Sequence, residues 1–263
     1  MKMRRSNSRL LHRRRKRRTI VRRILKLVEI AVCVGVIGVF TYAFFVYAEG
    51  STDFQVRYVK IDGLRYLDEH DVLEASGINP EGNILFFDSE AVRARVEAMP
   101  YVKLCSVELK FPDTVVLYIE EREPFATLML NNRSYEIDAD LVVLRAYAPT
   151  EMPVAPFFTE VAGMDFVQVG EVLEQENLCA AMALWRAFGA SGLGNALTVS
   201  ELAVYGADDI RMYCDEVPYE LRWGRGHFAR QVRRLEVLWS NRDGVLGCAE
   251  YLELRFDTDL ACK

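Results

Sequence analysis

The stretch that decides how this chain is arranged is IAVCVGVIGVFTYAFFVYA, residues 30–48, which contains no charged side chain. As an α-helix rising about 1.5 Å per residue it extends about 28 Å, close to the ~30 Å hydrocarbon core of a bilayer. The sequence therefore predicts one transmembrane helix at residues 30–48 and a separate tail at residues 1–29.

Charge on the two sides of this helix predicts its orientation. Residues 1–29 carry 13 Lys or Arg and one acid, Glu29, whereas residues 30–263 carry 20 basic and 37 acidic residues. Basic segments beside membrane helices stay in the cytoplasm. We therefore expect a single-pass type II protein of the cytoplasmic (inner) membrane, with the tail inside and about 215 residues outside.

Two other interpretations of the N-terminal region are weaker. A cleavable signal peptide is suggested by residues 46–48 (VYA), but its apolar region usually has only 7 to 15 residues and its basic region is short. The basic run at residues 13–18 is typical of nucleic-acid binding, but contact with anionic lipid beside a membrane helix also accounts for it. We expect no nucleic-acid partner.

The first part of the extracytoplasmic region follows the order strand, helix, helix, strand, strand. Asp68 and Asp88 stand where N-caps are expected, Gly77 follows the first helix, and Pro100 follows the second. Apolar residues alternate in the predicted strands. A three-stranded sheet covered by two helices suits this order. The predicted elements are strand 54–61, helix 69–76, a helix from 89 to about 99, and strands 102–110 and 114–121.

This region resembles the POTRA domain of the FtsQ/DivIB cell-division family. The similar segments are FQVRYVKIDGLRYLDEHDVLEASGI (54–78), GNILFFD (82–88), MPYV (99–102) and VELKFPDTVVLYIEEREPFA (107–126). The turn FPDT and the following EREPFA are the most specific of them. We expect a POTRA domain at residues 54–123.

The remaining residues, 124–263, are predicted to form a mixed α/β domain with a mainly antiparallel sheet, like the β domain of the same family. GRGHFARQVRRLEVL (224–238) and YLELRF (251–256) carry this resemblance. The overall class is α+β. The predicted elements are strands 125–130, 134–137, 141–145, 197–205, 210–214, 219–223 and 249–256, and helices 171–188 and 227–240.

The cysteines depart from the family pattern. Five of them follow the membrane helix, with no CxxC and no Cys/His metal spacing. Buried unpaired thiols are the favoured interpretation, and a disulfide between Cys248 and Cys262 is the alternative. The chain also ends seven residues after Phe256, which is expected to leave the last strand incomplete or exposed.

Catalytic patterns are weak. His12, His70 and His227 stand in no motif for a nucleophile, a base or a metal, and Ser191 lacks the glycine pattern of a hydrolase elbow. Residues 224–229 match a dinucleotide fingerprint, but the strand before them alternates in polarity as an antiparallel strand does. We expect no enzyme activity, cofactor, metal or small-molecule substrate.

The resemblance implies a divisome scaffold that binds FtsB-like and FtsL-like single-span proteins and links early with late division proteins during septum formation. It assigns partner contacts to Tyr251, Phe256 and Thr258, whereas Leu252 and Leu254 are expected in the core. A POTRA-bearing factor for outer-membrane protein assembly or transport is the alternative function, although the sequence lacks the alternating strands of a membrane barrel.

Overall fold

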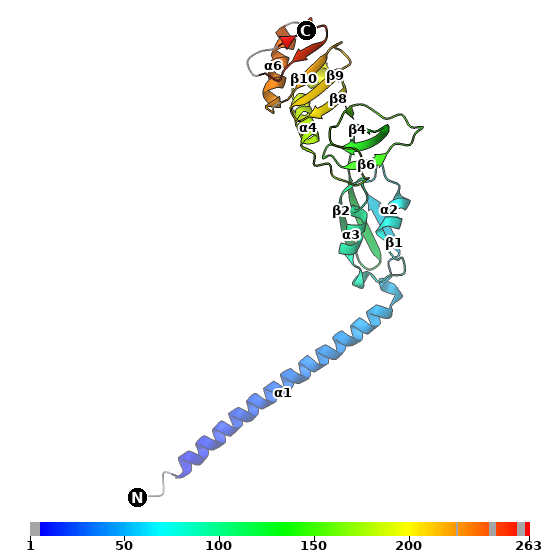
Figure 1. The fold of residues 1–263 in the computed structure, drawn as a ribbon. Helices are drawn as coiled ribbons and strands as arrows, with labels where there is room; N and C mark the ends of the chain where they lie inside the picture. The colour runs from blue at the N-terminus through cyan, green and yellow to red at the C-terminus, as the bar shows by residue number, and fades with distance from the viewer. Residues whose placement is uncertain (1–5, 225, 242–245, 257–260) are drawn as a thin grey trace. The chain divides into compact units, whose positions relative to one another are not determined.

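The structure is a computed structural model that describes residues 6–224, 226–241, 246–256 and 261–263, with side chains from residue 25 onward. It has one long helix and two sheets (Figure 1). The chain forms two compact units, one made of residues up to Lys60 with 79–87 and 109–115, the other of 61–78, 88–108 and 116–263. The domain limits expected from the sequence stay a prediction.

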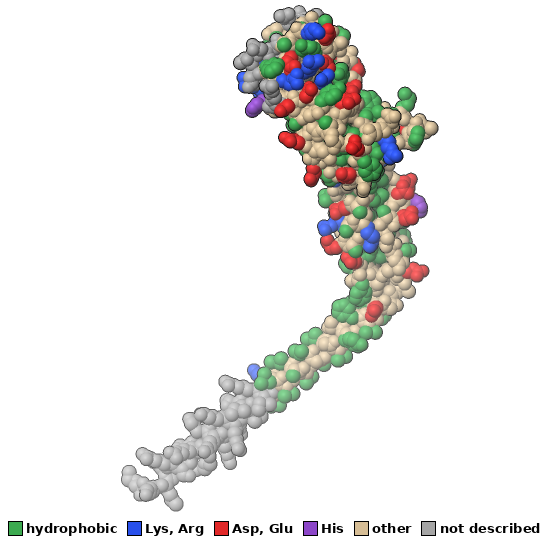
Figure 2. All heavy atoms as spheres, in the orientation of Figure 1, with side chains coloured by type: hydrophobic (Ala, Val, Ile, Leu, Met, Phe, Trp, Pro, Cys, Tyr) green, Lys and Arg blue, Asp and Glu red, His purple; other side chains and the backbone are tan. Residues whose placement is uncertain are grey.

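The long helix is α1 (Ser6–Gly50), of which Leu25–Gly50 is long and apolar enough to cross a membrane. Its apolar side chains, such as Phe40 and Tyr42, are exposed, and Figure 2 shows them in green along the described part of the helix. Such a surface is suited to lipid rather than water. The candidate span includes the predicted residues 30–48 and extends beyond both ends.

The smaller sheet has the strand order β1-β3-β2. Together with its helices it confirms the predicted order strand, helix, helix, strand, strand. Two short 3-10 turns lie at η1 (Thr52–Phe54) and η2 (Ile84–Phe86). The elements are β1 (Tyr58–Asp62), α2 (Glu69–Ser76), α3 (Ser89–Glu97), β2 (Val102–Lys110) and β3 (Thr114–Glu121).

Both predicted helix caps are present. The Asp68 carboxylate accepts a hydrogen bond from the His70 N–H at 2.8 Å, and Asp88 accepts one from the Ala91 N–H at 3.0 Å. Gly77 ends α2 in the left-handed conformation, as a C-terminal glycine does. This eight-residue helix buries Val72 and leaves its neighbour Leu73 exposed.

The larger sheet has nine strands in the order β12-β11-β10-β9-β8-β7-β4-β5-β6. Three neighbouring pairs are parallel, namely β10 with β11, β4 with β7, and β7 with β8, and the others are antiparallel, which confirms the expected mainly antiparallel sheet. Its strands are β4 (Pro124–Leu130), β5 (Arg133–Asp138), β6 (Val143–Ala146), β7 (Phe157–Thr159), β8 (Val199–Gly206), β9 (Asp209–Cys214), β10 (Glu220–Trp223), β11 (Tyr251–Glu253) and β12 (Ala261–Cys262).

The helices of this part are α4 (Glu176–Gly189), the short α5 (Leu193–Ala196) and α6 (Phe228–Asn241). Helix α4 contacts α6 and β8, and the apolar sides of α4 and α6 belong to the same core as the inner face of the sheet. Phe188 of α4 meets Trp223 of β10 edge to face, with ring centroids 6.3 Å apart. This core fixes the positions of β9, β10 and β11.

Several elements differ from the prediction. Helix α4 begins at Glu176 instead of residue 171, because residues 170–173 bond to the main chain of 141–143. The last predicted strand, 249–256, is reduced to β11. Strands β7 and β12 were not predicted, because two or three residues are too few to show an alternating pattern.

Candidate partner-binding edge of the sheet

Strands β9, β10 and β11 have one apolar and one polar face, because successive side chains of a strand point to opposite sides. Leu252 and Leu254 lie in the core, which confirms their predicted role. The residues on the apolar face are Ile210, Met212, Leu221, Trp223, Leu252 and Leu254. The opposite face carries charged side chains, and Figure 2 shows basic and acidic groups gathered together over β9 and β10.

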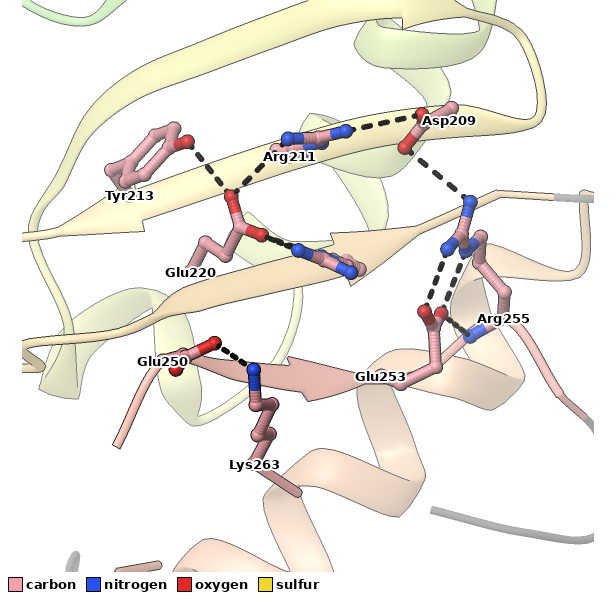
Figure 3. A network of polar contacts seen from close by, with 9 residues as sticks. Asp209, Arg211, Tyr213, Glu220, Glu250, Glu253, Arg255 and Lys263 are labelled. Carbon is pink, nitrogen blue, oxygen red and sulfur yellow. Dashed lines mark hydrogen bonds and ion pairs between the residues drawn. The ribbon is translucent and has the colours of Figure 1, made fainter. Parts of the chain in front are cut away.

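The charged side chains of this face form a network that crosses three strands (Figure 3). Arg211 of β9 lies 3.6 Å from Asp209 and 3.7 Å from Glu220 of β10. Arg222 of β10 pairs with Glu220 and also lies over the ring of Tyr251, with its guanidinium carbon 3.8 Å from the ring centroid. Cross-strand pairs of opposite charge stabilise a sheet by about 0.2–1 kcal/mol each.

Arg255 extends this network from the end of β11. Its guanidinium makes two contacts of 2.7 Å with the buried carboxylate of Glu253 and lies 3.4 Å from Asp209 of β9. Burial raises the pKa of Glu253, but the hydrogen bonds from Arg255 outweigh burial, and the pKa lies below its ordinary value. Glu253 is therefore held as a carboxylate, and Arg255 links the last strand to β9.

Glu220 is the centre of the second half of the network. It accepts a hydrogen bond from the Tyr213 hydroxyl at 2.9 Å, and Arg222 pairs with it on the other side. Burial raises the pKa of Glu220, but the hydrogen bonds from Arg222 and Tyr213 outweigh burial, and the pKa lies below its ordinary value. Burial and the bond to Glu220 raise the pKa of Tyr213 to about 12.

The network balances three arginines against three carboxylates: Arg211, Arg222 and Arg255 against Asp209, Glu220 and Glu253. Such mutual pairing stabilises a surface and provides no group poised for proton transfer. Within the described ranges no group of three His, Cys, Asp or Glu side chains could hold a metal ion. The charged groups of this face are therefore paired with one another.

The last predicted strand is incomplete, as expected, because β11 ends at Glu253, but its edge is not exposed, because β11 is paired on both sides. One side pairs in parallel with β10, and the other pairs antiparallel with β12 in the register Leu252 opposite Cys262 and Glu253 opposite Ala261. Lys263 accepts the N–H of Tyr251 at 3.3 Å and donates to the Tyr251 carbonyl at 3.1 Å. The chain's own C-terminal residues thus occupy this edge.

A disulfide joins Cys248 and Cys262 and fixes β12 to the residues before β11. The favoured interpretation of unpaired thiols is therefore wrong for this pair, and the alternative applies. The interpretation as buried unpaired thiols is confirmed for Cys105 and Cys214, which are buried and free. Cys179 is free but exposed. An ion pair of 2.7 Å joins Lys263 and Glu250 (Figure 3).

Two of the predicted partner residues are described: Tyr251 at the start of β11 and Phe256 shortly after its end. Tyr251 begins β11 and is half-buried beneath Arg222. Phe256 follows the end of the strand with 43% of its surface exposed, and its carbonyl accepts a hydrogen bond from Arg234 of α6. Thr258 lies outside the described residues. Because regular pairing stops at Glu253, Phe256 does not continue the inward alternation of Leu252 and Leu254.

Sequence reasoning missed the charged network and β12. The alternating charges of DIR (209–211), ELR (220–222) and ELR (253–255) are the signal that could have revealed the network. For β12, the available signal was the presence of Cys248 and Cys262 on either side of YLELRF, because a disulfide between them brings the residues after this strand back beside it.

Comparison with known proteins agrees with this architecture. Residues 54–122 match the model of the POTRA domain, FtsQ-type. The cell division protein FtsQ of Anaeromyxobacter sp. is 27% identical over 201 residues, covering 76% of this chain and 67% of that protein. That of Syntrophotalea carbinolica is 24% identical over 200 residues, covering 76% and 70%. The chain is therefore similar to FtsQ proteins over most of its length, and its residues 54–122 match a POTRA domain of the FtsQ type. The FtsQ of Geotalea daltonii is 19% identical over 94% of this chain and 89% of its own length.

The match to the FtsQ-type POTRA domain and the similarity to FtsQ proteins support a role in cell division, in the divisome. The apolar segment Leu25–Gly50 fits the membrane anchor of a division-site protein. The charged network and the β11–β12 edge lie at one end of the nine-stranded sheet.

Proposed function

We propose that this protein is a bitopic divisome scaffold that binds FtsB-like and FtsL-like single-span division proteins outside the cytoplasm. Its basic tail lies in the cytoplasm and its two sheets lie outside the inner membrane at the septum, where it links early with late division proteins. The charge balance on the two sides of the membrane helix supports this orientation.

The observation that carries the binding proposal is that β11 lies next to the end of the sheet and is covered there, among the described residues, only by the short strand β12. The outermost strand has two residues, both with exposed side chains, so this end of the sheet is protected by little structure. Sheet edges bind extended segments through main-chain hydrogen bonds and gain specificity from alternate side chains. Tyr251, Phe256 and Thr258 are the proposed partner contacts, and exposed Phe256 supplies the apolar one.

The membrane anchor strengthens such a contact. Partners with a single span lie in the same bilayer, so their extracytoplasmic segments meet this edge at a high effective concentration. A strand-addition contact that is weak between free proteins then suffices in the membrane. The proposed POTRA domain (54–123) and β domain (124–263) serve as the scaffold that presents the edge.

Substitution of Phe256 in the full-length protein tests this proposal. An FtsB-like single-span protein is reconstituted with the protein in nanodiscs, and its affinity is measured for wild type and Phe256→Lys. We expect at least a tenfold loss of affinity, because the lysine removes the apolar contact and adds a charge. The melting temperature is expected to change little, since Phe256 is outside the core.

Phe166→Lys is the matched control, because Phe166 is also an exposed phenylalanine but does not belong to β11 or β12. Its affinity should equal that of wild type. Equal affinities for Phe256→Lys and wild type would overturn the assigned edge. Capture from dividing cells should yield small single-span coiled-coil proteins, and recovery of outer-membrane barrels instead would contradict the divisome partners.

A further inference from the structure

We infer that the Cys248–Cys262 disulfide controls access to β11: while it is intact, β12 occupies the edge, and its reduction releases β12 so that a partner segment can bind. The identity of that partner segment rests on the proposed function, whereas the release of β12 does not. The contacts of residues 248–253 and 261–263 carry the inference.

The first step is that β12 is held by few interactions other than the disulfide. Ala261, Cys262 and Lys263 are all exposed, so no apolar side chain of β12 is buried in the core. The ion pair between Lys263 and Glu250 joins two exposed groups, and such pairs contribute little. What remains is main-chain hydrogen bonding, which for so short a strand barely offsets the entropy lost on ordering it.

The second step is that β12 uses the groups that an added strand would need. The Lys263 carbonyl accepts the N–H groups of Ala249 at 2.7 Å and Glu250 at 2.6 Å, as well as that of Tyr251. On the opposite side, Leu254 donates to Arg222 and Glu250 accepts from Glu220, so β10 remains paired when β12 leaves. Occupation by β12 and by a partner strand therefore exclude each other.

The third step is the chemistry of release. Cys262 is exposed, whereas Cys248 is 7% exposed, so a reductant approaches from the side of Cys262. A dithiol protein or small dithiol attacks one sulfur as a thiolate, which breaks the S–S bond and forms a mixed disulfide. The second thiol of the reductant then attacks this mixed disulfide and releases the remaining cysteine of the protein as a thiol. The protein gains two electrons and two protons as two thiols, and the reductant becomes a disulfide.

Amide hydrogen exchange of the full-length protein in nanodiscs tests the release directly. Exchange is measured with the disulfide intact and after reduction by dithiothreitol. We expect the Tyr251 amide to exchange at least tenfold faster after reduction, while the amide of Leu202 in the central strand β8 keeps its protection. Equal exchange of Tyr251 in both states would overturn the inference and would leave the proposed function unaffected.

Two variants separate the disulfide from other thiols. Cys248→Ser with Cys262→Ser should show the fast Tyr251 exchange without any reductant. Cys179→Ser removes a free exposed thiol outside the disulfide and should respond to dithiothreitol as wild type does. If the double variant does not fold, reduction of the wild type supplies the same comparison, with Leu202 protection reporting on the sheet.

Partner binding completes the test. An FtsB-like single-span protein in the same nanodiscs should bind the reduced protein at least tenfold more tightly than the oxidised one. If β12 is released but binding is equally tight in both states and depends on Phe256, control by the disulfide is overturned. The proposed function is preserved in that case. Release of β12 with no binding in either state would overturn the proposed function and leave the release established.

Discussion

Arg255 holds the carboxylate of Glu253 with two parallel contacts, Nε to Oε1 and Nη2 to Oε2, both 2.7 Å long. The Glu253 side chain is 5% exposed and that of Arg255 is 24% exposed. Two-pronged pairs between arginine and carboxylate are among the stronger polar contacts in proteins. The pair fixes the end of β11, next to the proposed partner residue Phe256.

Removing only the arginine of this pair should destabilise the fold. Arg255→Met leaves a buried carboxylate with less compensation, and we expect the free energy of unfolding to fall by about 2–4 kcal/mol. Glu253→Gln with Arg255→Met should recover part of the loss, which chemical denaturation of all four proteins measures. Arg93→Met, which breaks an exposed pair with Glu90, should cost no more than ~1 kcal/mol. Equal losses for Arg93→Met and Arg255→Met would contradict the assignment.

Acid should weaken the same region. The pKa values of Glu220 and Glu253 in the folded protein lie below the ordinary 4.5, so their stabilisation is present above pH 4.5 and is lost as the pH falls through the lower folded values. We expect the melting temperature to drop on acidification below pH 4.5. Glu253→Gln should show a shallower drop, and an unchanged pH profile in that variant would disprove the linkage.

Asp138 is expected to be a second structural carboxylate. Its side chain is buried and accepts hydrogen bonds from the main-chain N–H of Val142 at 2.7 Å and from Arg122 at 2.9 Å. Asp138→Ala leaves these donors unsatisfied and should lower the free energy of unfolding by about 3 kcal/mol. Asp140→Ala, which removes a half-exposed carboxylate 3.3 Å from Lys103, is the control and should cost about 1 kcal/mol or less. A similar loss for both variants would contradict a special role for Asp138.

Gly63 should not tolerate a side chain. Its φ is +102°, and a Cβ atom there would lie 2.0 Å from the carbonyl oxygen of Ile119 in β3. Gly63→Ala must therefore displace the main chain, and we expect a loss of about 3 kcal/mol or more in unfolding free energy. Gly163→Ala shares a positive φ but meets no atom within 4 Å, so its loss should stay near 1 kcal/mol. Thermal melting of both variants distinguishes the clash from the backbone preference.

Much of the fold could be predicted because its signals are local. Asp68, Gly77 and Asp88 act within one turn of the helices that they delimit, and strands β2 and β3 have the predicted bounds. Residues 171–173 were misassigned to a helix because their partners, residues 141–143, lie about thirty positions earlier in the chain. Pairing over that separation leaves no periodic trace in the sequence.

The candidate site was only half predictable for the same reason. The sequence indicated a last strand at YLELRF, and the inward positions of Leu252 and Leu254 agree with its alternation. It did not indicate that β11 would lie between β10 and β12 or that Arg255 would reach Asp209. These contacts join segments that are far apart in the sequence and become neighbours only in the folded structure.

By itself the sequence determined a helix long and apolar enough to cross a membrane, the class of fold and the likeness to FtsQ, because hydrophobic length, helix caps and turn residues act over short distances. Only the tertiary structure decided what covers the end of the sheet. The strand order places β11 beside β10, and the disulfide brings Cys262 back to Cys248 across the sheet edge. Which segment pairs with an exposed sheet edge depends on which segment the folded chain places beside it. The order of residues along the chain does not show this.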